Sequence, residues 1–189
     1  MGAAWADRGH QIMFGARNPD DPKYASLGSV ETNEFATAAA DVVVLCTPWQ
    51  TTQAAVQGCG DLSGKVLIDC TNPLTPDIAA LEVGLDSSGA EEIAKWATGA
   101  RVCKAMNQIG APMMDTPQLP GQPVMFICGD DEAKSVTAGL VAELGFETID
   151  VGDLTLARLL EPYGLLWIHL ALRRGLGTNF GFGLLRGQS

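Results

Sequence analysis

The sequence predicts an α/β fold with a doubly wound, mainly parallel β-sheet. Unbroken apolar runs alternate along the chain with helix-like stretches. Strands that helices cover on both faces show such runs, whereas half-exposed strands alternate apolar and polar residues. With 189 residues, 47% of them hydrophobic, the chain is long enough for one globular domain and a small appendage.

The strands and helices follow one another in regular order. Strands are expected over 11–14, 41–49, 65–73, 100–107, 123–131 and 147–151, and helices over 1–8, 33–40, 52–57, 88–97 and 130–145. The helix from Ser88 has a capping box, because Glu91 stands three residues later. One long helical pattern over 154–172 contains Pro162 and precedes a glycine-rich end. We therefore divide the chain into a nucleotide-binding domain, 1–152, and a C-terminal helical segment, 153–189.

Composition excludes several classes of partner. The formal net charge of −10 repels phosphate backbones, so we expect a small-molecule substrate and neither nucleic acid nor an anionic membrane. No signal peptide starts the chain, and the apolar run 165–172 is far shorter than the ~20 residues of a membrane span. The five cysteines show no CxxC spacing. These features predict a reduced, cytoplasmic protein without a metal site or a disulfide framework.

The ends of four predicted strands share one character. "GARNP" follows Phe14, "CTPW" follows Leu45, "DCTNP" follows Ile68 and "AMNQIG" follows Lys104. Small, polar and proline residues make tight turns whose backbone can approach a ligand closely. In open parallel sheets, ligands bind at the carboxyl ends of the strands. Four such endings in succession therefore predict a nucleotide site at one edge of the sheet.

Arg17 indicates which nucleotide the site prefers. Dinucleotide folds that bind NAD usually offer a carboxylate to the ribose 2′-hydroxyl after the second strand. Here Ala16, Arg17 and Asn18 hold that place, with Lys23 close behind. A guanidinium binds a 2′-phosphate bidentately, so we predict NADP as the cofactor. The alternative is a solvated surface arginine on a loop.

These stretches together resemble a known family. "GHQIMFGARNP", "DVVVLCTPW", "VLIDCTNPL", "KAMNQIG" and "LEPYGLLWIHLA", in this order, are similar to the NADPH-dependent reductases related to coenzyme F420:NADP oxidoreductase. The resemblance implies a Rossmann-type domain with a short C-terminal helical part, often a homodimer. It also implies hydride transfer between NADP(H) and a deazaflavin, coenzyme F420, as co-substrate.

The family begins with a strand and a G-x-G-x-x-G loop, and in that register Gly2 would be the last glycine. The resemblance therefore implies that the chain lacks its first strand and most of the phosphate loop, roughly ten residues. Two explanations stay open: a reading frame that starts at an internal methionine, which we favour, or a truncated product with little activity. Either way, we expect a gap or a forced pairing where the first strand belongs.

The resemblance also distributes the cofactor along the strand ends. The resemblance assigns the middle of the dinucleotide to Thr47, Pro48 and Trp49. It assigns the nicotinamide ribose to Thr71, Asn72 and Pro73, and the nicotinamide itself to Ala105, Met106 and Asn107. Turn formation alone is the alternative role for the polar residues among them.

Hydride transfer needs two aligned rings rather than a strong acid, base or nucleophile, so no catalytic residue is expected. His169 is interpreted as a core histidine, with proton donation as the alternative. Arg158 and Glu161, three residues apart, are expected to form an ion pair on the helix surface. A non-catalytic dinucleotide-binding module, or an inactive fragment, is the second functional hypothesis.

Overall fold

The computed structural model describes residues 1–187, and its strands form two sheets. The smaller sheet pairs β1 (Met13–Ala16) in parallel with β2 (Ser29–Thr32). The larger sheet has the order β3 (Val42–Leu45), β4 (Val66–Asp69), β5 (Arg101–Lys104), β6 (Val124–Gly129) and β7 (Glu147–Asp150). Its neighbouring strands are parallel except β5 and β6, which are antiparallel.

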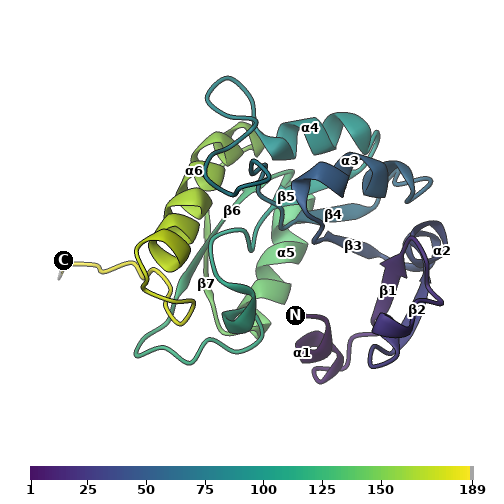
Figure 1. Cartoon of the computed structure of the whole chain (residues 1–189), viewed down its shortest axis with the longest axis horizontal. Helices are drawn as coiled ribbons and strands as arrows, with labels where there is room; N and C mark the ends of the chain where they lie inside the picture. The colour runs from purple at the N-terminus through teal and green to yellow at the C-terminus, as the bar shows by residue number, and fades with distance from the viewer. Residues whose placement is uncertain (188–189) are drawn as a thin grey trace.

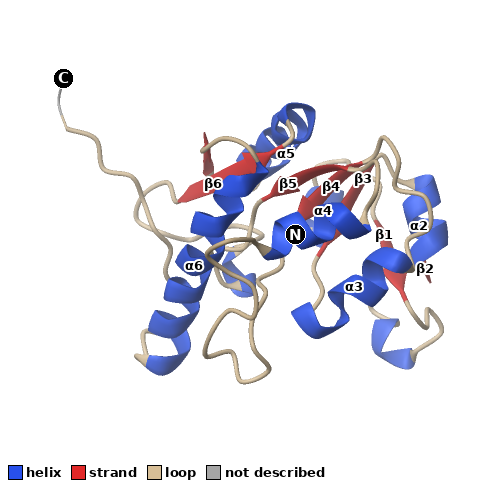
Figure 2. Ribbon diagram, turned by 90° about the horizontal axis from the view of Figure 1, so that it is seen from above, coloured by secondary structure: helices blue, strands red, loops and turns tan. Residues whose placement is uncertain are grey.

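Helices cover both faces of the larger sheet (Figures 1 and 2). On one face, Val56 of α3 (Trp49–Gln57) and Ile93 of α4 (Gly89–Trp96) pack on Leu67 and Val102. On the other face, Trp5 of α1 (Gly2–Ala6) and residues of α5 (Asp131–Glu143) pack on Ile68 and Cys103. Helix α2 (Asn33–Ala39) lies beside β1 and β2. The predicted α/β, doubly wound, mainly parallel architecture is therefore confirmed.

The sheet is interrupted between β1 and β3. No hydrogen bond of the described residues pairs these two strands, and a cavity of about 610 Å³ lies between them. All four residues of β4 are buried, whereas Val42, Val43 and Val44 of β3 are only half-buried. The expected gap is therefore present. Within residues 1–187, none of the helices has both the length and the apolar character needed to cross a bilayer.

Two strand features differ from the prediction. Strand β2 was not predicted, because "SVET" is short and half polar and carries no continuous apolar run. Strand β6 runs antiparallel to β5, a reversal that apolar content cannot reveal. Gly129 permits the close approach there: its φ is +141°, and a Cβ atom would lie 2.2 Å from the carbonyl oxygen of Val102.

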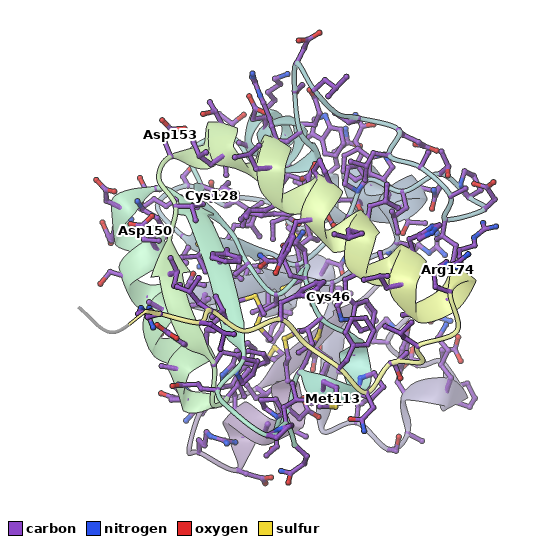
Figure 3. All side chains as sticks on the ribbon, turned by 90° about the vertical axis from the view of Figure 1, so that its left-hand side faces the viewer. Cys46, Met113, Cys128, Asp150, Asp153 and Arg174 are labelled. Atoms are coloured by element: carbon purple, nitrogen blue, oxygen red, sulfur yellow. The ribbon has the colours of Figure 1, made fainter. Side chains whose placement is uncertain are left out.

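The C-terminal part combines α6 (Ala157–Ile168) with an extended tail. A 3-10 turn (Leu154–Leu156) precedes α6, and a π-helical turn (His169–Arg173) follows it, so the predicted single helix has three parts. The tail folds back along α6 (Figure 3). The indole of Trp167 donates to the carbonyl of Phe180 at 3.1 Å, and the two rings stack at 4.9 Å. The backbone of Phe182 also accepts a hydrogen bond from Val124 at 2.9 Å, which ties the tail to β6.

Candidate functional site

The carboxyl ends of β3, β4 and β5 form one cluster. Gly89, the first residue of α4, shows how closely they meet: a Cβ atom there would lie 3.1 Å from the Trp49 ring, 3.2 Å from Pro73 and 3.2 Å from the Glu161 carboxylate. Segments after β3 and β4 thus converge on the N-terminus of α4 and on α6. The segment after β5 joins them through Asn107, as described next.

Asn72 and Asn107 bind each other across neighbouring strand ends. Asn72 donates its amide to the carbonyl of Asn107 at 2.9 Å, and Asn107 donates to the side-chain oxygen of Asn72 at 3.0 Å. Asn107 also donates to the carbonyl of Leu160 in α6, at 2.9 Å. Gly164 of α6 packs directly on this pair, where a Cβ atom would lie 2.7 Å from the carbonyl oxygen of Asn107. The two amides therefore fix α6 over the strand ends.

Thr71 and Met106 show two features typical of a ligand site. The hydroxyl of Thr71 is buried and has no hydrogen-bond partner among the described residues. Met106 is fully buried with a left-handed φ of 59°, an uncommon conformation for a residue with a side chain. Buried polar groups are normally paired, and backbone strain concentrates at functional sites. The backbone of Met106 therefore marks these strand ends as a candidate site, whereas protein atoms cover the Thr71 hydroxyl.

A buried ionic cluster lies directly beneath these strand ends. The ammonium of Lys104 contacts the carboxylates of Asp69 at 2.8 Å and Glu161 at 3.0 Å, and all three side chains are at most 1% exposed. Although burial lowers the pKa of Lys104, the two carboxylates outweigh burial and raise it above its usual value. Glu161 also accepts hydrogen bonds from the backbone of Gly89 at 2.8 Å and Ala90 at 3.0 Å. One charged network therefore joins β4, β5, α4 and α6.

The expected pairing of Arg158 with Glu161 is wrong. Arg158 binds the carboxylate of Glu91 through two hydrogen bonds, at 2.9 and 2.6 Å, while Glu161 points into the protein. Their sequence spacing allowed a local pair, but each residue bridges α6 to a distant element instead. The sequence reasoning also missed Asp69 and Lys104 as a site feature. Their placement at the ends of two apolar runs was the available signal.

The turn after β3 is held by local contacts. The hydroxyl groups of Thr47 and Thr52 lie 2.9 Å apart, and Pro48 precedes the first turn of α3. Trp49 packs against Trp96 of α4, with ring centroids 5.5 Å apart. These contacts hold the turn at the edge where β4 and β5 also end.

The residues predicted for the adenosine end lie apart from this cluster. Ala16 ends β1 and is buried, and Arg17 and Asn18 follow it on the surface. Lys23 contacts the carboxylate of its neighbour Asp21 at 2.9 Å. No ion pair of the described residues involves Arg17, whereas Arg101, Arg158 and Arg186 each pair with a carboxylate. Gly2 begins α1 and lines the cavity between β1 and β3.

Two cysteines stand next to each other at the same edge. Cys46 follows β3 and Cys70 follows β4, and the backbone of Cys70 donates to Leu45 at 3.0 Å. Cys46 is exposed, and a hydrogen bond from Cys70 lowers the pKa of its thiol. All five cysteines are free thiols.

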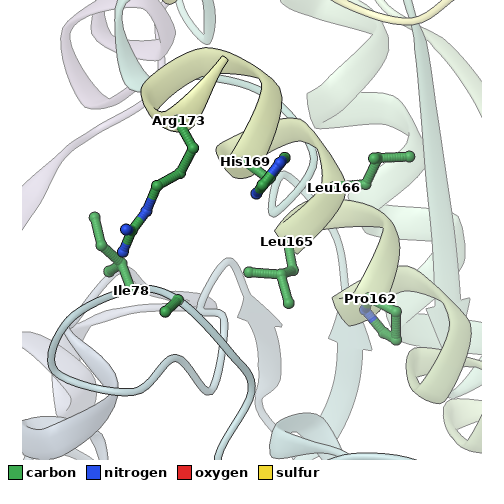
Figure 4. A pocket seen from close by; sticks show the side chains of 7 residues that line it. Ile78, Pro162, Leu165, Leu166, His169 and Arg173 are labelled. Atoms are coloured by element: carbon green, nitrogen blue, oxygen red, sulfur yellow. The ribbon is translucent and has the colours of Figure 1, made fainter. Parts of the chain in front are cut away.

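A second cavity, of about 430 Å³, lies between α6 and the loop around Ile78 (Figure 4). Its walls are Ile78, Ala79, Pro162, Leu165, Leu166, His169 and Arg173. The expectation that His169 is a core histidine is wrong, because the residue is exposed and lines this cavity. His169 lies three residues after Leu166 and four after Leu165, so ordinary helix spacing places it on the face of α6 that lines this cavity.

Known proteins are similar to this chain in both architecture and sequence. Residues 1–73 match the family described as NADP oxidoreductase, coenzyme F420-dependent. The F420-dependent NADP reductase of Methanothermobacter thermautotrophicus is 30% identical over 89% of this chain and 82% of its own length. A structure of a candidate F420-dependent NADP-reductase from Arthrobacter sp. FB24 has a TM-score of 0.90 and 30% identity, and the match covers 98% of this chain and 93% of that one.

Metalloreductase STEAP3 of Rattus norvegicus is 28% identical over 83% of this chain, which spans only 32% of that protein. The matches to the two reductases, in contrast, cover most of both chains. The chain belongs to the family of coenzyme F420-dependent NADP oxidoreductases, and thus to the NADP-dependent oxidoreductases.

Proposed function

We propose that this protein transfers a hydride between NADP(H) and a deazaflavin of the coenzyme F420 type, or a similarly flat acceptor. The similarity to F420-dependent NADP reductases along most of both chains carries the proposal. The left-handed backbone of Met106 supports it, because this residue lies at the carboxyl end of β5, where open α/β sheets bind nucleotides. NADPH, when bound, supplies the hydride, and the protein supplies binding, alignment and exclusion of water.

Each part of the cofactor is assigned to its own group of site residues. Arg17 and Asn18 bind the 2′-phosphate, with Lys23 as a second cation once it leaves Asp21. Gly2 approaches the pyrophosphate, and the backbone of Thr47, Pro48 and Trp49 follows the middle of the dinucleotide. Thr71, Asn72 and Pro73 contact the nicotinamide ribose, and Ala105, Met106 and Asn107 contact the nicotinamide. The mutual hydrogen bonds of Asn72 and Asn107 restrict their side chains, so their orientation does not depend on the ligand.

The acceptor is proposed to bind in the cavity beside α6. A volume of about 430 Å³ suits a small organic ligand. Pro162, Leu165 and Leu166 offer an apolar wall for a flat ring, and Arg173 offers a cation for an anionic substituent. Gly164, on the neighbouring face of the same helix, packs on Asn72 and Asn107. For hydride transfer the acceptor ring must extend from this cavity into direct contact with the nicotinamide, on the side of α6 that faces Asn72 and Asn107.

Titration of the protein with NADPH and NADH, followed by turnover with coenzyme F420, tests the proposal. Tighter binding of NADPH together with hydride transfer supports it. Binding without turnover of any flat acceptor would favour the alternative, a non-catalytic dinucleotide-binding module. The open cavity beside Gly2 is the observation that favours this alternative.

Three observations support proposals on the oligomeric state, the cellular location and the domain division of the protein. Leu159, Leu166 and Leu172 are 64%, 49% and 55% exposed on α6 and the turn after it, which favours a homodimer through this face. Five free thiols favour a reducing cytoplasm. The aromatic contacts of α6 with the tail favour 153–189 as a separate helical segment on the domain 1–152. Light scattering of the purified protein would decide its oligomeric state.

A further inference from the structure

Lys104 uses its whole hydrogen-bonding capacity within the buried ionic cluster. An ammonium group has three N–H donors. Here one donates to the carboxylate of Asp69 at 2.8 Å, one donates to the backbone carbonyl of Thr71, and the ammonium also contacts the carboxylate of Glu161 at 3.0 Å. The side chain of Lys104, the last residue of β5, therefore joins the end of β4 to α6.

The same cluster fixes both peptide groups that flank Thr71. The N–H of Thr71 donates to the other carboxylate oxygen of Asp69 at 2.8 Å, and its carbonyl accepts from Lys104. Asn72 follows directly and donates its amide to the carbonyl of Asn107, which stands three residues after Lys104. The two segments proposed to contact the nicotinamide ribose and the nicotinamide therefore both begin at this cluster.

The third partner of the ammonium, Glu161, belongs to the helix that lines the proposed acceptor cavity. Pro162, its neighbour in α6, and Leu165, one turn further, are walls of that cavity (Figure 4). Glu161 also accepts hydrogen bonds from the first backbone N–H groups of α4 at 2.8 and 3.0 Å, so its carboxylate is held on several sides. The ammonium of Lys104 is thus a direct link between the nicotinamide segments and the acceptor helix.

Stability alone does not account for a buried cluster of this kind. The side chains of Lys104, Asp69 and Glu161 are at most 1% exposed, and removing charges from water carries a large cost. Apolar side chains of similar volume often stabilise an interior as well or better. A fully satisfied polar network, in contrast, holds its members rigidly in one arrangement. Hydride transfer depends on such precision, because a misplacement of about 1 Å can slow a reaction by ~10²-fold.

We propose that Lys104 is a positioning residue, which holds the nicotinamide-binding strand ends and the α6 wall of the acceptor cavity in one relative position. It acts through Thr71 and Glu161 and touches neither substrate. Although burial lowers the pKa of Lys104, the two carboxylates raise it above its usual value, so the ammonium persists at neutral pH. The proposal rests on the proposed function, since both ligands must bind where that function places them.

A single turnover distinguishes a positioning role of Lys104 from a purely structural one. The full chain with bound NADPH is mixed with saturating coenzyme F420. Lys104→Met should lower the rate constant of hydride transfer by about 10- to 100-fold and keep the dissociation constant of NADPH within about twofold, because the adenosine end of the cofactor binds elsewhere. A purely structural role predicts fewer folded molecules, hence a smaller amplitude with an unchanged rate constant, and that result would overturn the proposal.

Lys134→Met is the matched control. The side chain of Lys134 is only 10% exposed and contacts Asp131 at 3.0 Å and Asp150 at 2.8 Å, outside the candidate site. This variant should therefore keep the rate constant of the parent chain. Equal slowing in Lys134→Met and Lys104→Met would contradict a role specific to Lys104.

Should Lys104→Met unfold, Glu161→Gln provides the second measurement. This variant removes the charged contact of Lys104 with α6 and leaves one ammonium beside the one carboxylate of Asp69, so it imposes no uncompensated charge on the interior. It should slow hydride transfer by about tenfold or more, again with NADPH affinity retained. A folded Glu161→Gln variant with the rate constant of the parent chain would overturn the proposal.

The fluorescence anisotropy of bound NADPH tests the same role without turnover. The emission comes from the nicotinamide, so a ring that the site holds firmly gives a higher anisotropy than a mobile one. At saturation, Lys104→Met should lower the anisotropy towards that of free NADPH, whereas Lys134→Met should leave it unchanged. Equal anisotropy in the parent chain and Lys104→Met would overturn the proposal. A parent chain that reduces no flat acceptor would refute the proposed function instead, and the anisotropy would still decide the role of Lys104.

Discussion

At the scale of single residues, the predicted preference for NADPH is assigned to Arg17. Its guanidinium is exposed and pairs with no carboxylate of the described residues, so it is available to a phosphate. Arg17→Ala should weaken NADPH binding by about 10- to 100-fold, the value of one or two charge-assisted hydrogen bonds, and leave NADH binding unchanged. Fluorescence titration measures both. Arg186→Ala, which removes an arginine paired with Glu147, is the control, and an equal loss there would contradict the assignment.

Cys46 is predicted to be the thiol that reacts first. It is exposed, and the hydrogen bond from Cys70 lowers its pKa, whereas burial raises the pKa of Cys103 to about 11 and of Cys128 to about 12. Because the thiolate is the nucleophile, a larger fraction of Cys46 than of Cys103 or Cys128 is in the reactive thiolate form at neutral pH. Iodoacetamide labelling followed by peptide mass spectrometry should find Cys46 modified first. Cys70→Ala should shift its pH dependence upward, and earlier labelling of Cys103 would refute the prediction.

At the scale of elements, Gly164 controls how α6 docks on the strand ends. A Cβ atom there would lie 2.7 Å from the carbonyl of Asn107 and 2.8 Å from the side-chain oxygen of Asn72. Gly164→Ala should lower the free energy of unfolding by about 1–3 kcal/mol through overpacking and also reduce turnover. The matched control is Gly139→Ala in α5, where a Cβ atom meets open space. That variant should gain about 0.5–1 kcal/mol in urea unfolding, and equal behaviour of the two would contradict the docking role.

The buried ionic cluster should contribute far more to the free energy of unfolding than the ion pairs on the surface do. Lys104→Met leaves Asp69 and Glu161 buried without a cation, and should lower the free energy of unfolding by about 3–5 kcal/mol. Lys95→Met removes an exposed partner of Glu92 and should cost at most about 0.5 kcal/mol in the same urea titration. Because the pKa of Lys104 is raised, its contribution is full below the unfolded lysine pKa of ~10.4 and is lost only above it. A small loss in Lys104→Met would show that the carboxylates find other partners.

At the scale of the whole molecule, the divided sheet predicts uneven stability. The β1–β2 pair lacks hydrogen bonds to β3, whereas β4 is buried and paired on both sides. Amides of β1 and β2 should therefore exchange through local opening at a lower free energy than amides of β4 and β5. Hydrogen exchange over time and denaturant concentration measures this difference. A single common opening free energy would mean that the two sheets unfold as one unit.

Much of this architecture could be predicted, for identifiable reasons. The strands β3 to β6 carry apolar runs, because burial on both faces selects such residues, and Ser88 and Asp130 cap their helices as the sequence indicates. Strand β2 was not predictable, because its sequence is short and half polar. The reversal of β6 was not predictable either, because it depends on the close contact of Gly129 with Val102, which is distant in the sequence. For the site, polar strand endings predicted Thr71, Asn72 and Asn107. The partners of Glu161 and Arg158 were not predictable, because tertiary packing overrides helix spacing.

The stacking of Trp167 on Phe180 makes the C-terminal tail visible to spectroscopy. Its indole N–H donates to the backbone of the tail, so release of that segment would wet the ring and red-shift its emission. An affinity tag appended after Ser189 would pull on this contact, whereas proteolytic trimming before Phe180 would abolish it. Because Trp5, Trp49 and Trp96 also emit, the difference in emission between the chain and its Trp167→Phe variant would measure whether the tail around Phe180 stays folded on α6.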